Sequence, residues 1–130
     1  LNRDKLRNIV LKKMNLCLVI TNLTGGGAER ALLDLAKAFM QTGNHVEIIL
    51  FENKINYEIP TGLHISIVGK NGFFKNGLIG KKVLQIKFEK LWSNLNNKFN
   101  FELNVIHQCY LYEIIRDFDS FKNLIEDYIS

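Results

Sequence analysis

The sequence is poor in the residues that crosslink, kink or anchor a chain. Among 130 residues there are two cysteines, one proline and one tryptophan. The isolated Cys17 and Cys109 offer neither a disulfide framework nor metal-ligand spacing, so a reducing cytoplasm is the expected location. No apolar run approaches the length of a membrane span, and the run at 16–20 is too short for a signal-peptide core. We therefore expect a soluble protein, or one peripheral at the inner face of a membrane.

Net charge is absent from most of the chain, because residues 14–130 hold twelve basic and twelve acidic residues. The net charge of +4 resides in residues 1–13, which hold five basic residues and one acid. Residues 70–98 hold seven lysines against one glutamate, whereas residues 99–130 hold six acids against two basic residues. This uneven distribution argues against a uniformly basic nucleic-acid binder, and we expect no nucleic acid as partner.

The first half of the chain is patterned as one βαβ unit. Residues 15–21 are apolar on both faces, as in a buried parallel strand. Three glycines follow, and from Ala28 the apolar residues fall at helical spacing until Gly43, a natural helix stop. Residues 45–51 form a second apolar strand. The helix face consists of Leu32, Leu35, Ala36, Phe39 and Met40.

The second half continues the alternation with weaker signals. We expect a strand at 63–68, a loop at 69–80, a helix from Gly80 and a strand at 101–106. A last helix over 114–125 is loosely patterned. The fold class is therefore α/β, a Rossmann-like three-layer parallel sheet over 14–107. Residues 1–13 are expected to be a basic extension, and residues 108–130 a divergent, helical tail.

The best candidate site is the glycine run between the first strand and its helix. Gly25, Gly26 and Gly27 carry no Cβ atoms, so a ligand can approach the main chain. The N–H groups of residues 26–29, including those of Ala28 and Glu29, can then bind an anion with help from the helix dipole. Glu29 would repel an adjacent phosphate, so a sugar hydroxyl or a more distant diphosphate fits better. The alternative is a tight turn without a ligand.

Two other nucleotide-binding motifs match only in part. A dinucleotide fingerprint requires glycine at its first, third and sixth positions; Gly25 and Gly27 fill the first two of these, but the sixth position is Arg30. Glu52 stands near the end of the second strand, where a ribose-binding acid is expected. A P-loop requires Gly-Lys-Ser/Thr, and the chain has Gly-Ala-Glu-Arg.

Specific stretches resemble a known enzyme family. These are MNLCLVITNLTGGGAER at 14–30, ALLDLAKA at 31–38 and GNHVEIIL at 43–50. Together they are similar to the opening of bacterial retaining glycosyltransferases of family four, which have the GT-B fold. The likeness extends over 14–69, is weaker to about 107, where FELNVIH at 101–107 resembles a family segment ending in histidine, and is then lost.

The resemblance implies the N-terminal half-domain of such an enzyme. The family transfers a sugar from a nucleotide sugar to a surface polysaccharide, lipopolysaccharide or lipid-linked glycan, with no further cofactor. Its glycine loop lies against the donor diphosphate, and a second domain holds the nucleotide sugar. We therefore expect a truncated chain, from an early stop or a frame shift near residue 107, that is inactive alone. His107 becomes a candidate active-site histidine. The alternative is an ordinary loop histidine, and no general base is assigned.

Two further side-chain groups have competing interpretations. His45 and His64 are expected to be structural and far apart, with no carboxylate at ligand spacing, so no metal site is inferred. Near Phe73, Phe74 and Trp92, a group of lysines suits an anionic membrane surface or, alternatively, a solvated helix face. These lysines are Lys75, Lys81, Lys82, Lys87 and Lys90.

Two other functional classes stay open. The chain could be a non-catalytic or dinucleotide-binding Rossmann module, in which Glu52 holds a ribose. It could also be an inert remnant whose exposed sheet edges promote aggregation.

Overall fold

The computed structural model describes residues 13–69, 77–108, 111–115 and 118–129. Its elements are β1 (Asn15–Ile20), α2 (Gly27–Gln41), β2 (His45–Leu50), β3 (His64–Ile67), α3 (Gly77–Phe99), β4 (Leu103–Gln108), β5 (Leu111–Ile115) and α4 (Phe118–Ile129). The basic extension lies outside the described residues, apart from Lys13, and so do Phe73, Phe74, Lys75 and Cys109.

The strands form one sheet in the order β3-β2-β1-β4-β5. The first four run parallel, with Asn15 opposite His45, Leu16 opposite Leu103, and Glu47 opposite His64. β5 pairs antiparallel with β4. The α/β class is therefore confirmed, and the order of the four parallel strands matches the first four strands of the 3-2-1-4-5-6 Rossmann order.

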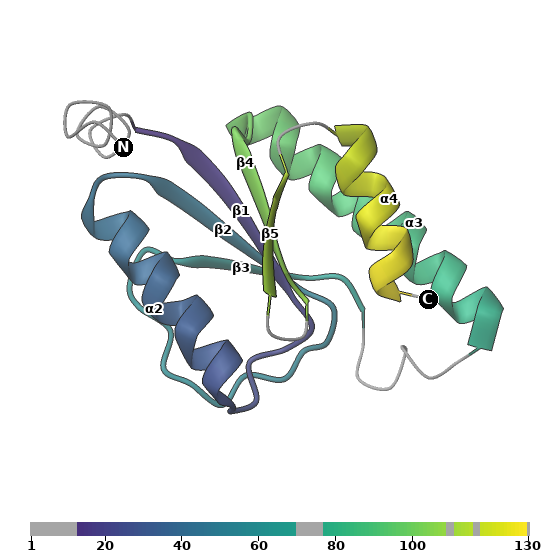
Figure 1. The fold of residues 1–130 in the computed structure, drawn as a ribbon, viewed down its shortest axis with the longest axis horizontal. Coiled ribbons are helices and arrows are strands. Elements are labelled where there is room, and N and C mark those ends of the chain that lie inside the picture. Colours follow the sequence, from purple (N-terminus) through teal and green to yellow (C-terminus); the bar gives the residue numbers. More distant parts are fainter. Residues whose placement is uncertain (1–12, 70–76, 109–110, 116–117, 130) are drawn as a thin grey trace.

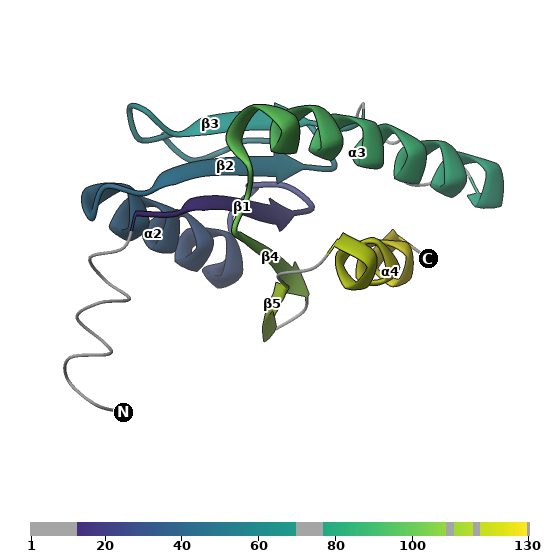
Figure 2. The ribbon, with the colours of Figure 1, turned by 90° about the horizontal axis from the view of Figure 1, so that it is seen from above.

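Helices cover both faces of the sheet, as Figures 1 and 2 show. Alternate residues of β1 point to opposite faces. Leu16, Leu18 and Ile20 pack with α2, whereas Cys17 and Val19 pack with α3 and α4. Both sides of β1 and β2 are thus buried, which explains why their sequences are apolar without alternation. The predicted three layers are therefore present: α2 on one face of the sheet, and α3 and α4 on the other.

The first half matches its predicted boundaries closely. Helix α2 ends at Gln41, and Gly43 adopts φ +89°, the conformation of a glycine helix stop. On the sheet-facing side, Leu33 is buried where Leu35 was expected. The helical period is right, but the buried stripe is rotated by part of a turn.

The second half departs from the prediction in three places. Helix α3 begins at Gly77 rather than Gly80, and β4 lies two residues later than expected. The predicted helix over 114–125 is wrong at its start, because Leu111–Ile115 forms β5 and the helix begins at Phe118. The stretch LYEII is rich in residues that favour strands, and pairing with β4 satisfies backbone groups that would otherwise be unpaired.

Trp92 belongs to the core rather than to a surface aromatic patch. It is buried among the side chains beneath α3, and its indole N–H donates to Oδ1 of Asn104 at 2.8 Å. The prediction that Trp92 lies on a membrane-binding face is therefore wrong, because its ring is buried in the core.

Candidate functional site

The glycine loop lies at the carboxyl edge of the sheet, between β1 and α2. Gly25 adopts φ +108°, a backbone conformation that residues other than glycine rarely occupy. Gly26 caps the helix in an extended conformation, and α2 begins at Gly27. All three glycines are exposed, and a Cβ atom added to Gly27 would meet no atom within 4 Å. The space in front of the loop is thus open.

Three backbone N–H groups point from the start of α2 without an intrahelical partner. The first helical hydrogen bond runs from Arg30 N to Gly26 O, at 3.2 Å. The amides of residues 27–29 precede it and are the donors that a helix N-terminus offers to a ligand. The Gly26 N–H is different, because it donates to the Tyr57 hydroxyl at 3.1 Å, and that hydroxyl lies 3.1 Å from Gly26 O. Three of the four expected donors are therefore available.

Glu29 brings negative charge back over the loop. A Cβ atom built on Gly26 would lie 2.6 Å from Glu29 Oε2, so this carboxylate folds towards the N-terminus of its own helix. A carboxylate accepts hydrogen bonds from hydroxyl groups and repels a phosphate beside it. The geometry therefore favours a ligand with hydroxyls near Glu29 and its anionic group farther away.

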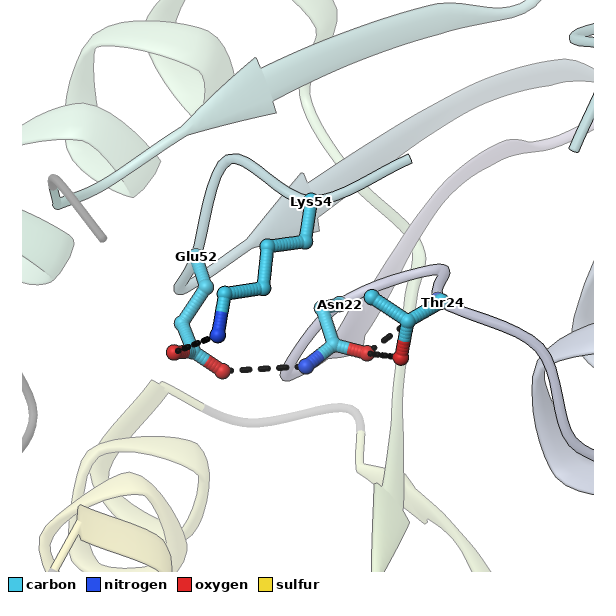
Figure 3. A network of polar contacts seen from close by, with 4 residues as sticks. All are labelled: Asn22, Thr24, Glu52 and Lys54. Carbon is cyan, nitrogen blue, oxygen red and sulfur yellow. Dashed lines mark hydrogen bonds and ion pairs between the residues drawn. The ribbon is translucent and has the colours of Figure 1, made fainter. Parts of the chain in front are cut away.

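The segments that follow β1 and β2 hold one another in place. Leu23 is fully buried, donates its N–H to Lys54 O and accepts from Asn56 N, both at 2.8 Å. Figure 3 shows the adjoining polar network, in which Asn22 Nδ2 donates to Glu52 Oε1 at 2.9 Å and Asn22 Oδ1 accepts from the Thr24 hydroxyl at 2.8 Å. These contacts position the glycine loop before any ligand binds.

Glu52 lies near the loop, but both of its carboxylate oxygens are engaged. Oε1 accepts from Asn22, and Oε2 lies 3.4 Å from Lys54 Nζ (Figure 3). A ribose-binding acid must offer these oxygens to the ligand. Dinucleotide binding would therefore require Glu52 to exchange its present partners.

His107 falls within β4 rather than in a loop after it. Its neighbour Ile106 pairs with Val19 near the end of β1, so the backbone of His107 reaches the same sheet edge as the glycine loop. Its side chain lies outside the described part of the structure. The edge between β1 and β4 is where the strand order reverses, the usual ligand position in open α/β sheets.

A groove of about 700 Å³ adjoins the loop. It lies between α2 and the segment that joins β2 to β3. The lining includes Arg30, Asp34, Lys37, Tyr57, Ile59 and Pro60. Because Tyr57 borders both the groove and Gly26, a ligand at the loop has space to extend along α2.

His45 and His64 are not far apart, and that prediction is wrong. The parallel pairing of β2 and β3 brings His45 Nε2 to 3.5 Å and His64 Nδ1 to 3.2 Å from Oε2 of Glu47. They lie at the amino edge of the sheet, opposite the glycine loop. Sequence spacing missed this cluster because one histidine comes from a neighbouring strand.

The lysines of α3 lie partly in solvent. Lys82, Lys87 and Lys90 are exposed, and Lys81 is half-buried. Among the described helices, none combines the length and the apolar character that a bilayer crossing requires. An exposed row of lysines is compatible with an anionic surface and with ordinary solvation.

Comparison with known proteins does not identify a relative. No family model matches the chain, and neither a curated protein nor a solved structure gives a significant match. The site must therefore be interpreted from its own geometry. The features that sequence reasoning missed are Tyr57, Asn22 and Lys54. Only Asn22-Leu-Thr24, a typical side-chain turn, carried a local signal for one of them.

Proposed function

We propose that the chain binds a nucleotide sugar at the glycine loop, as the first half of a GT-B glycosyltransferase of family four. The observation that carries this proposal is the exposed loop, with Gly25 at φ +108° in front of three helix amides that precede the first intrahelical hydrogen bond. The parallel β3-β2-β1-β4 order and the position at the reversal of strand order support it. The acceptor would be a surface polysaccharide, lipopolysaccharide or lipid-linked glycan.

The roles of the residues follow from charge and reach. For the amides of Gly27, Ala28 and Glu29 to donate to a diphosphate oxygen, the Glu29 carboxylate would have to turn away from Gly26, where it would accept from a sugar hydroxyl instead. In transfer with retention, main-chain donors stabilise the negative charge that develops on the departing diphosphate. His107 remains a candidate for contact with a sugar hydroxyl. The exposed lysines of α3 would attract an anionic membrane that carries a lipid-linked acceptor.

Amide chemical shifts provide a direct test of binding. We expect titration with UDP and with UDP- and GDP-sugars to shift the ¹⁵N–¹H signals of residues 27–29 before those of β3. Gly27→Leu places a side chain in the open space where the ligand approaches, so the affinity should fall at least about tenfold, or ~1.4 kcal/mol. Ala38→Leu is the matched control, because Ala38 is exposed on the same helix, far from the loop.

The outcomes separate the proposal from its rival. Binding that Gly27→Leu leaves unchanged, or shifts confined to other regions, would contradict a ligand site at the loop. Tight binding of NAD that is lost in Glu52→Ala would instead favour a dinucleotide-binding module. Glu52 would then have to leave Asn22 and Lys54, its partners in the structure.

A further inference from the structure

The amino edge of the sheet holds a row of polar side chains on the face beneath α3. His64 pairs with Glu47, Glu47 pairs with Cys17, and Cys17 pairs with Asn104. Glu47 and Asn104 are 3% and 2% exposed and are the buried polar residues of the described chain. A buried polar group is costly unless it is hydrogen-bonded. The hydrogen-bond partners of Glu47 and Asn104 therefore decide whether their burial is compensated.

The two buried polar residues differ in their partners. Asn104 accepts a hydrogen bond from the Trp92 indole at 2.8 Å. In contrast, Oε2 of Glu47 and Nε2 of His45 are buried without a hydrogen-bond partner among the residues that the structure describes. Burial raises the pKa of the Glu47 carboxyl, while His64, His45 and Lys98 oppose that rise. Glu47 Oε2 and His45 Nε2 thus lie 3.5 Å apart, within ion-pair distance but without a hydrogen bond.

The distances suit a shared cation. Two ligands about 2.0–2.1 Å from a tetrahedral zinc ion lie roughly 3.3 Å from each other. Glu47 Oε2 lies 3.5 Å from His45 Nε2 and 3.2 Å from His64 Nδ1, and the three ligand atoms all lie within 4.8 Å of one another. The His64 side chain is 61% exposed, so it can turn to close the longest of these separations.

The end of α3 borders the cluster and brings both the partial negative charge of a helix C-terminus and the positive charge of Lys98. The His45 ring stacks on Phe99, the last residue of α3, with centroids 4.1 Å apart. The C-terminus of a helix carries partial negative charge and attracts cations. The His64 side chain is 61% exposed, so solvent reaches this side of the cluster.

We propose that His45, Glu47 and His64 form a binding site for a divalent transition-metal ion, with Zn²⁺ as the best-fitting ion. Two imidazoles and one carboxylate are a ligand set that zinc accepts, and three protein ligands leave one position open. The site lies at the opposite edge from the glycine loop, so it is independent of the function proposed above.

Cobalt spectroscopy on the full chain tests this site. Protein without a histidine tag, stripped with a chelator, is titrated with Co²⁺ and then with Zn²⁺. We expect visible absorption bands of tetrahedral Co²⁺ that Zn²⁺ abolishes at one equivalent. Glu47→Gln and His64→Ala should each weaken the affinity on the order of 100-fold, since even the loss of an indirect ligand contact costs 10–100-fold.

His107→Ala is the matched control, because the backbone of His107 lies at the other end of the sheet. Its affinity should equal that of the wild type. The proposal fails if Co²⁺ gives no tetrahedral bands, if Glu47→Gln and His64→Ala bind like the wild type, or if His107→Ala loses the metal equally. If Glu47→Gln does not fold, the exposed His64 still decides the question, because its removal leaves the core intact.

Discussion

The two edges of the sheet present different kinds of chemistry. At the carboxyl edge, the glycine loop offers backbone N–H groups that are exposed and aligned by a helix. At the amino edge, Glu47 and the two histidines offer side chains, and the carboxylate is buried. The first site is written in consecutive residues, whereas the second arises only from the register of β2 against β3. Contiguous sites can thus be found in a sequence, and sites across strands require the pairing.

Metal addition should have the largest effect and should act at the amino edge. A ligand at 100 times its Kd stabilises the folded state by about 2.7 kcal/mol if it binds only that state. We expect Zn²⁺ at that excess to raise the free energy of unfolding accordingly, as measured by urea titration with and without chelator. Amide exchange should slow first in β2 and β3. Slower amide exchange at the glycine loop instead would mean that the metal binds at the carboxyl edge and not at the amino edge.

Asn104→Ala tests the satisfied polar residue of the same edge. It leaves the buried Trp92 indole N–H without its acceptor, so we expect a loss of about 1–3 kcal/mol in the free energy of unfolding. Trp92 is the single tryptophan of the chain, so its fluorescence reports the urea transition directly. Asn123→Ala, at an exposed position on α4, is the control. A loss below about 0.5 kcal/mol, typical of surface changes, would show that the bond contributes little.

A pair of glycine variants tests whether the carboxyl edge is shaped by conformation. Gly25→Ala forces a side chain into φ +108°, which costs about 1–3 kcal/mol. Gly27→Ala adds a methyl group in open space at the first helical residue, so the stability should change by less than about 0.5 kcal/mol. Thermal unfolding of both variants gives the comparison. Equal losses would mean that Gly25 is not held in the left-handed region.

The end of α3 provides the smallest expected effect. Asn100 adopts φ +54°, and its N–H donates to Asn96 O at 2.7 Å. Glycine takes this conformation more readily than asparagine, so Asn100→Gly should raise the free energy of unfolding by up to about 1 kcal/mol. Asn100→Ala should lower it. The opposite order in chemical denaturation would contradict the left-handed helix stop next to Phe99.

Much of the fold could be predicted from local pattern. The buried strands 15–20 and 45–50 were visible because both of their faces are apolar, and α2 because its apolar residues repeat at helical spacing. β5 was missed because a loose helical pattern over 114–125 was preferred to the strand-favouring residues of LYEII, and the pairing with β4 is a tertiary contact. The glycine loop was visible as adjacent residues. The contacts of Tyr57 with Gly26, 31 positions away, carried no such signal.

The Tyr57 hydroxyl, which is bonded to Gly26, competes with any ligand for the Gly26 amide. Any ligand that needs the Gly26 amide must first displace a phenol tethered to the same chain. Ligand selectivity would then depend on this displacement, since a weakly binding ligand could not replace the Tyr57 hydroxyl at the Gly26 amide. Tyr57→Phe removes only that oxygen, so the Gly26 amide would become accessible to weakly binding ligands as well.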